Sequence, residues 1–150
     1  MADKPRIPVT GGCLCGAVRF ESTEKPNLVG FCHCRMCQMA SGNLFTVFAD
    51  FPGSTFSYTR GEPTYYRSSE LATRGFCREC GTPIVFQYDD SSGPAVMLGC
   101  LDHPEDWPPD WEHSGIESKV PWYEIHDDLP QTTTDESEFL KAARERKASS

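Results

Sequence analysis

The chain has 150 residues, of which 38% are hydrophobic, and its formal net charge is −8. This size and composition predict one globular domain with a modest core. The negative charge disfavours nucleic acids and anionic membranes as partners, and no apolar run is long enough to span a bilayer.

Twelve glycines and twelve prolines interrupt the chain too often for long helices, so short strands joined by turns are expected. Residues 1–10 are polar and contain proline, which predicts a flexible N-terminal lead. Because this lead shows no apolar signal segment, we expect a reducing, cytoplasmic location. There the eight cysteines would bind metal rather than form disulfides.

Apolar or alternating runs bounded by turn residues predict the strands. They cover residues 17–21, 44–48, 55–59, 64–68, 73–76, 83–88 and 95–101. A single helical turn is expected over residues 38–42, ending at Gly42. Further along, residues 103–111 predict a surface loop, and residues 112–119 and 120–125 predict extended segments.

The last part of the chain has a different pattern. Capping residues and acids at 133–138 precede a run with basic residues that ends near Arg146, and this order favours a helix. We therefore expect one domain over residues 11–130, followed by a helical tail over residues 131–150.

The most informative stretch carries Cys32, Cys34 and Cys37. Their spacing follows neither a helix nor a strand period, and they lie too close for orderly disulfides. It predicts a turn on which three thiols converge on a metal ion. Tetrahedral zinc takes four ligands, so these three leave one position open, as in a catalytic site. A fourth ligand from elsewhere in the chain would instead make the site closed and structural.

Two further cysteine pairs resemble each other, because each is followed by glycine. They are Cys13 with Cys15 and Cys77 with Cys80. A C-x2-C-G knuckle such as the second pair is a specific zinc signal when another pair exists elsewhere. We therefore expect the two pairs to form one closed four-thiol site. The rival grouping joins Cys32 and Cys34 to the second pair, and it leaves Cys13, Cys15 and Cys37 as the other set.

The remaining cysteine and the histidines have less specific surroundings. Cys100 lies in the predicted strand 95–101 and is expected to be a small buried residue. His33 lies between two predicted ligands, where its side chain should point away from the metal; a proton relay is the alternative. His103 and His113 fall in loop or edge segments and are expected at the surface, with His113 the better candidate for a fourth ligand.

Together, these motifs resemble the glutathione-dependent formaldehyde-activating enzyme family, which includes the centromere protein V-like proteins. The resemblance covers residues 11–130, and its ordered combination of three cysteine clusters is much more specific than any one cluster. The matching motifs are Gly12-Cys13-x-Cys15-Gly16, Cys32-His33-Cys34-x-x-Cys37 with Ala40-Ser41-Gly42, Arg74-x-Phe76-Cys77-x-x-Cys80-Gly81-Thr82-Pro83, and Pro121-Trp122 with Asp128-Leu129-Pro130.

This resemblance implies a mainly β, Mss4-like tent fold of short antiparallel strands with a short C-terminal helix. It also implies two zinc sites. A structural zinc would be held by the residues that match the family's first and third clusters: Cys13, Cys15, Cys77 and Cys80. A second, labile zinc would be held by Cys32, Cys34 and Cys37, which would then be the catalytic residues.

The activity implied by the resemblance is a carbon–sulfur lyase or synthase reaction that joins glutathione and formaldehyde as S-(hydroxymethyl)glutathione. The partners would be a small-molecule thiol and a small aldehyde, with no nucleic acid and no membrane. A zinc-bound thiol has a lowered pKa, so the open site would hold the substrate as a thiolate. The alternative function is a non-catalytic zinc module for protein interaction or for zinc or thiol storage.

Three further residues near these motifs have two possible roles each. Arg35 and Arg74 could meet a carboxylate of glutathione, although ordinary surface or ion-paired arginines are equally expected. Trp122 follows Pro121 and is expected in the core, with a pocket wall as the alternative.

Overall fold

The computed structural model describes residues 4–150, so the first three residues of the expected lead lie outside the described residues. Within the described part, the strands are β1 (Val9–Gly12), β2 (Arg19–Ser22), β3 (Leu28–Cys32), β4 (Thr46–Asp50), β5 (Phe56–Arg60), β6 (Thr64–Arg67), β7 (Ala72–Phe76), β8 (Pro83–Tyr88), β9 (Ala95–Met97) and β10 (His113–Ser114). The α-helices are α1 (Arg35–Ser41) and α2 (Glu138–Ala148). Short 3₁₀ turns cover Gly53–Thr55, Leu98–Cys100, Pro104–Asp106, Ile116–Ser118 and Thr134–Glu136.

The strands form two sheets. One has three strands in the order β1-β2-β5, and the other has seven in the order β10-β3-β4-β9-β8-β7-β6. Neighbouring strands are antiparallel except for β10, which runs parallel to β3. The expected mainly β fold of short antiparallel strands with a C-terminal helix is confirmed.

Side chains from both sheets share one core. Phe20 of the three-stranded sheet is 1% exposed, and Ile84 and Val96 of the seven-stranded sheet are fully buried. These three side chains belong to one cluster of buried hydrophobic residues. The hydrophobic effect therefore holds the two sheets together across this core.

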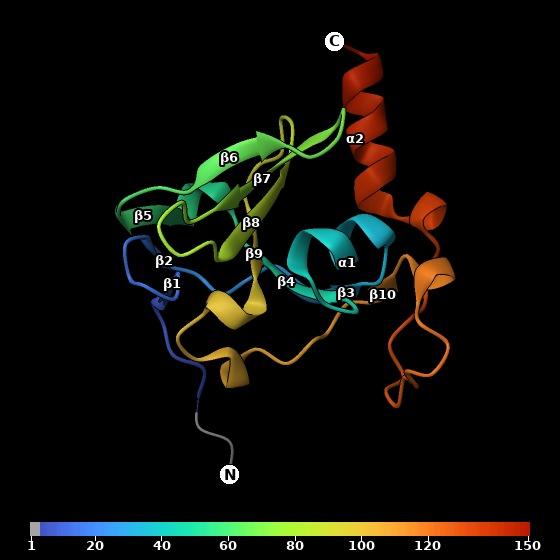
Figure 1. The fold of residues 1–150 in the computed structure, drawn as a ribbon, viewed down its shortest axis with the longest axis horizontal. Helices are drawn as coiled ribbons and strands as arrows, with labels where there is room; N and C mark the ends of the chain where they lie inside the picture. Colours follow the sequence, from blue (N-terminus) through green and yellow to red (C-terminus); the bar gives the residue numbers. More distant parts are fainter. Residues whose placement is uncertain (1–3) are drawn as a thin grey trace.

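Helix α2 stands at one side of the molecule, beside the hairpin of β6 and β7 (Figure 1). Lys147 forms an ion pair with Glu70 of that hairpin, and Arg146 donates a hydrogen bond to the carbonyl of Asp89. The helix begins at Glu138, at the end of the predicted capping stretch. Ser137 is its N-cap and accepts a hydrogen bond from the amide of Leu140, and a 3₁₀ turn precedes it.

In the N-terminal half, several elements have other bounds than the sequence predicts. Strand β1 begins at Val9, inside the expected lead, because Val9 is 4% exposed and pairs with Ser22. The strand expected over residues 17–21 begins only at Arg19, since the preceding residues form a cysteine turn. Helix α1 is longer than the expected single turn, although it ends at Gly42 in the left-handed conformation as predicted.

In the C-terminal half, two predicted extended segments also differ from the structure. The strand expected over residues 95–101 ends at Met97, and Cys100 lies in the 3₁₀ turn that follows. Residues 120–125 form no strand. Pro121 has no amide to donate, and Lys119 Nζ donates to two carbonyls of this segment, which closes it into a turn. Of the helices that the structure describes, neither has the length and apolar character needed to cross a membrane.

Candidate metal sites

The thiols of Cys13, Cys15, Cys77 and Cys80 come together, all within 4.8 Å of one another. The first pair follows β1 of the three-stranded sheet, and the second lies in the turn between β7 and β8 of the seven-stranded sheet. The Sγ atoms of Cys13 and Cys15 are 3.6 Å apart, and those of Cys15 and Cys77 are 3.8 Å apart. Zinc–sulfur bonds of about 2.3 Å in a tetrahedron place sulfur atoms about 3.8 Å apart. This site therefore fits a four-coordinate zinc ion.

A glycine follows each cysteine pair and turns the chain back. Gly16 and Gly81 both adopt positive φ angles, 81° and 80°, which let the chain turn back after the cysteines. The amide that reaches a thiol is that of Val18, which donates to Cys13 Sγ at 3.3 Å. A hydrogen bond from the Thr82 hydroxyl lowers the pKa of Cys80 to about 6. These contacts favour the thiolate forms that metal binding requires.

A second cluster consists of Cys32, Cys34 and Cys37, whose thiols also lie within 4.8 Å of one another. We call it the three-cysteine site. Cys32 ends β3, Cys34 is the N-cap of α1, and Cys37 lies in the first turn of that helix. The unequal spacing arises because the chain changes from strand to helix between these residues. Among residues 4–150, no histidine or carboxylate joins the three thiols, so a tetrahedral metal held here would keep one position for another ligand.

Strand β10 fixes the loop that carries these thiols. The His33 amide donates to the Ser114 carbonyl at 2.8 Å, and the Phe31 amide donates to the Glu112 carbonyl at 2.8 Å. Gly115 follows β10 with a φ of 65°, and a Cβ there would lie 2.7 Å from the Cys34 backbone nitrogen. Only glycine allows this close approach.

The three thiols differ in their acidity. Hydrogen bonds from Cys32 and Cys37 lower the pKa of Cys34 to about 2, and hydrogen bonding to Cys34 raises the pKa of Cys32. The Cys34 sulfur also accepts the Cys37 amide at 3.4 Å at the positive end of α1. Among the three thiols, the surroundings of Cys34 therefore favour the thiolate form. Arg74 adds a positive charge, with Nη2 at 3.4 Å from Cys37 Sγ.

The two histidines near the site are buried and paired. His33 is 1% exposed and His113 is fully buried, so the expectation that His113 lies at the surface is wrong. His33 Nε2 lies 2.9 Å from His113 Nδ1, and His113 Nε2 lies 2.9 Å from an Asp127 carboxylate oxygen. Both ring nitrogens of His113 have protein partners, so it is not available as a fourth metal ligand. It is buried because its ring stacks on Phe31 with centroids 4.1 Å apart.

The three thiols line a cavity of about 1040 Å³. Helix α2 supplies part of its wall, so the C-terminal helix helps to enclose the site. Large apolar and aromatic side chains form part of the lining, together with polar and charged ones; the large apolar and aromatic ones are Leu28, Phe31, Met36, Phe48, Leu71, Phe86, Tyr88, Trp111, Phe139 and Leu140. The four-thiol site, in contrast, has a complete ligand set of its own. The arrangement therefore combines one closed site with one site that a small molecule can reach.

Other candidates lie elsewhere. Arg35 is exposed on α1 and donates to the Gln38 side chain at 2.5 Å. The His103 side chain is 45% exposed, at the surface as expected. Trp122 is 72% exposed, so its expected core position is wrong, because the segment around it forms an exposed turn. Cys100 is buried and its thiol donates to the Pro83 carbonyl.

Two residues that matter to the site were missed from the sequence. An isolated glycine within an extended segment signals a close backbone approach, so Gly115 could have been found. Asp127 gives no such signal, since it lies in an acidic stretch and contacts a histidine 14 residues earlier in the chain.

The chain is similar to several known proteins. Residues 8–114 match the family described as glutathione-dependent formaldehyde-activating enzyme. An uncharacterized lyase of Schizosaccharomyces pombe is 30% identical over 91 residues, which are 61% of this chain and 66% of that protein. A crystal structure of a Rhodobacter sphaeroides protein aligns with a TM-score of 0.49 and 20% identity, covering 82% of this chain and 99% of the other. Because the family match covers more than half of its residues, the chain belongs to the glutathione-dependent formaldehyde-activating enzyme family.

Proposed function

We propose that this protein is a zinc-dependent carbon–sulfur lyase or synthase that forms or cleaves the adduct of a thiol and a small aldehyde. The observation that carries the proposal is the three-cysteine site, which lies open to a large cavity. The family membership and the lyase name of the yeast relative support the reaction class. The family name also supports glutathione as the thiol and formaldehyde as the aldehyde.

The two sites would have different roles. The four thiols of Cys13, Cys15, Cys77 and Cys80 would hold a structural zinc, because they complete its coordination and join the two sheets. Cys32, Cys34 and Cys37 would hold a second, labile zinc. When bound there, zinc supplies one function, which is to lower the pKa of a substrate thiol.

The residues around the site would assist in separate ways. The pairing of His33 with His113 would hold the loop in one geometry, and Arg74 would offset the negative charge of the thiolates. The apolar cavity walls would limit access of water to the reacting thiol. A reducing, cytoplasmic location is part of the proposal, because the cysteines must stay reduced to bind zinc.

The test is the rate at which formaldehyde and glutathione exchange with their adduct, measured by NMR exchange spectroscopy on zinc-loaded protein. We expect wild type to raise the rate above the uncatalysed reaction and Cys34→Ser to remove the increase. Cys100→Ser is the matched control, because Cys100 belongs to neither cluster and serine keeps a donor for the Pro83 carbonyl. If wild type and Cys34→Ser exchange at the uncatalysed rate with several thiols and aldehydes, the protein is a non-catalytic zinc module.

A further inference from the structure

Arg74 is a buried cation whose hydrogen-bonding capacity is only partly used. It is 5% exposed, and its Nη2 donates to Cys37 Sγ at 3.4 Å. Its Nε and Nη1 are buried without a hydrogen-bond partner. Within residues 4–150, no carboxylate forms an ion pair with Arg74, although the protein is strongly acidic. Buried donors of this kind are rare in native proteins and indicate a partner that binds there.

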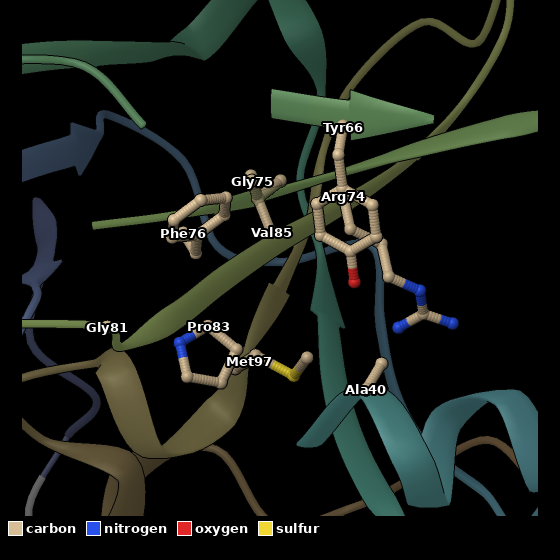
Figure 2. Close-up of a pocket in the computed structure, with 9 residues that line it drawn as sticks. All are labelled: Ala40, Tyr66, Arg74, Gly75, Phe76, Gly81, Pro83, Val85 and Met97. Atoms are coloured by element: carbon tan, nitrogen blue, oxygen red, sulfur yellow. The ribbon is translucent and has the colours of Figure 1, made fainter. Parts of the chain in front are cut away.

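The guanidinium is held in place rather than free to move to water. Its Cζ atom lies 4.9 Å from the centroid of the Phe86 ring, a cation–π contact. Figure 2 shows the side chain extending from β7 toward helix α1, on the side where Ala40 lies. A rigid, preorganised donor of this type suits an anionic oxygen, because arginine keeps its charge and presents several N–H groups in one plane.

Arg74 also borders the cavity at the three-cysteine site. It lines the cavity that the three-cysteine site opens into, and it lines a smaller neighbouring cavity of about 150 Å³ (Figure 2). The other cations that line the large cavity have partners of their own. These are Arg144 with Asp135, Arg146 with the Asp89 carbonyl, and Lys147 with Glu70. Among the described cations of this wall, Arg74 is therefore the one with buried donors that have no protein partner.

We propose that Arg74 binds the oxygen that becomes negative when the substrate thiolate adds to the aldehyde. This inference rests on the proposed function. In the addition, a sulfur electron pair forms the carbon–sulfur bond, the π bond of the carbonyl breaks, and its electrons move to oxygen. The resulting alkoxide takes a proton from water, which balances the proton that the thiol released on ionising. Arg74 stays protonated throughout and donates hydrogen bonds to this oxygen.

The distance to Cys37 selects this oxygen over the carboxylates of glutathione. Because Nη2 is 3.4 Å from Cys37 Sγ, Arg74 would lie close to a substrate sulfur held at the three-cysteine site. The adduct oxygen is two bonds from the substrate sulfur. Both carboxylates of glutathione are several bonds farther away along a flexible peptide, so they would reach other parts of the cavity.

The test uses two probes that differ in one charge. Zinc-loaded full-length protein is titrated by calorimetry with mercaptoacetate, which carries an oxygen anion close to sulfur, and with mercaptoacetamide, its neutral isostere. The quantity compared is the affinity for mercaptoacetate divided by the affinity for mercaptoacetamide. We expect Arg74→Met to lower this ratio by about tenfold or more, as expected for a charged hydrogen bond worth about 1.5–3 kcal/mol. The difference in thiol acidity between the probes cancels when this ratio is compared between variants.

Two further variants complete the design. Arg67→Met removes a cation from the neighbouring strand that is paired with Asp89 and does not line the cavity, so we expect the ratio to stay at its wild-type value. Arg74→Lys keeps the positive charge beside the thiolates but loses the planar donors. We expect this variant to retain zinc and to lose most of the preference for mercaptoacetate. If Arg74→Met fails to hold its second zinc, the comparison rests on Arg74→Lys.

The outcomes separate the two proposals. If both thiols bind wild type and the ratio is the same in wild type and in the Arg74 variants, the role assigned to Arg74 is wrong while the proposed function stands. If neither thiol binds wild-type protein loaded with two zinc ions, the proposed function fails and the assignment of Arg74 fails with it.

Discussion

His33 Nε2 lies 2.9 Å from His113 Nδ1, and His113 Nε2 lies 2.9 Å from the Asp127 carboxylate. A carboxylate only accepts hydrogen bonds, so His113 donates from Nε2. In the neutral ring its Nδ1 then accepts, and His33 donates from Nε2. The surface carboxylate of Asp127 therefore sets the tautomer of the residue between Cys32 and Cys34.

The first prediction concerns this chain of contacts. In Asp127→Asn the carboxylate is replaced by an amide, which can donate a hydrogen bond as well as accept one. His113 is then no longer required to carry its proton on Nε2. We expect the affinity of the three-cysteine site for zinc to fall by about tenfold, as for other outer contacts of metal sites. The measurement is a competition titration with a chromogenic chelator. Asp128→Asn is the control on the adjacent exposed residue, and equal losses in both variants would contradict the role of Asp127.

A second prediction concerns acid stability. Burial, with further contributions from the charges of His113 and Lys119, lowers the pKa of His33 to about 4. An unfolded histidine has a pKa of about 6.5, so between these values the unfolded chain binds a proton that the folded chain excludes. The free energy of unfolding should therefore decrease as the pH falls through this window, by up to about 3 kcal/mol in total.

His33→Gln removes this titrating group, so its unfolding free energy should depend less steeply on pH than that of wild type. Urea unfolding between about pH 7 and pH 5 measures both slopes. Parallel slopes for the two proteins would show that His33 does not resist protonation in the folded state.

A third prediction uses two glycines with similar backbone angles. Gly115 has a φ of 65° and Gly42 a φ of 68°, but only at Gly115 would a Cβ strike the backbone of Cys34. Gly42→Ala should cost about 1 kcal/mol from the positive φ alone. Gly115→Ala should cost at least about 2 kcal/mol and also weaken zinc binding at the three-cysteine site. Thermal unfolding and zinc titration of both variants make the comparison, and equal effects would mean that the contact with Cys34 is unimportant.

The sequence predicted the elements whose signals are local. The three short cysteine motifs and the C-terminal helix each follow from residues close together in the chain. Strand β1 was missed because two of its four residues are glycine, and the burial of Val9 comes from pairing with β2. The error arises because pairing with another strand, rather than local sequence, decides the structure of this segment.

The surroundings of the three-cysteine site show the same limit. The buried position of His113 depends on parallel pairing between β10 and β3, which joins segments about 80 residues apart. The unmet donors of Arg74 depend on how β7 packs near α1. The burial of His113 and the unpaired donors of Arg74 could not be predicted from the spacing of residues in the sequence, because both arise only when the sheet is assembled.

A fourth prediction distinguishes the four-thiol site from the three-cysteine site. The four-thiol site joins the cysteine turn after β1 to the turn between β7 and β8, so it links the two sheets. Cys80→Ser should lower the free energy of unfolding by an amount on the order of 5 kcal/mol, because metal binding is coupled to folding. Cys34→Ser should lower it much less. Denaturant unfolding of both variants tests this, and similar losses would show that the two sites contribute equally to stability.

The most direct test of the account is the zinc content of the protein purified without chelators, compared with Cys34→Ser and repeated with glutathione present. We predict two zinc ions per wild-type chain and one per Cys34→Ser chain, with glutathione affecting the second ion alone. One zinc ion per chain, unaffected by the substitution or by glutathione, would contradict the division into one closed and one open site.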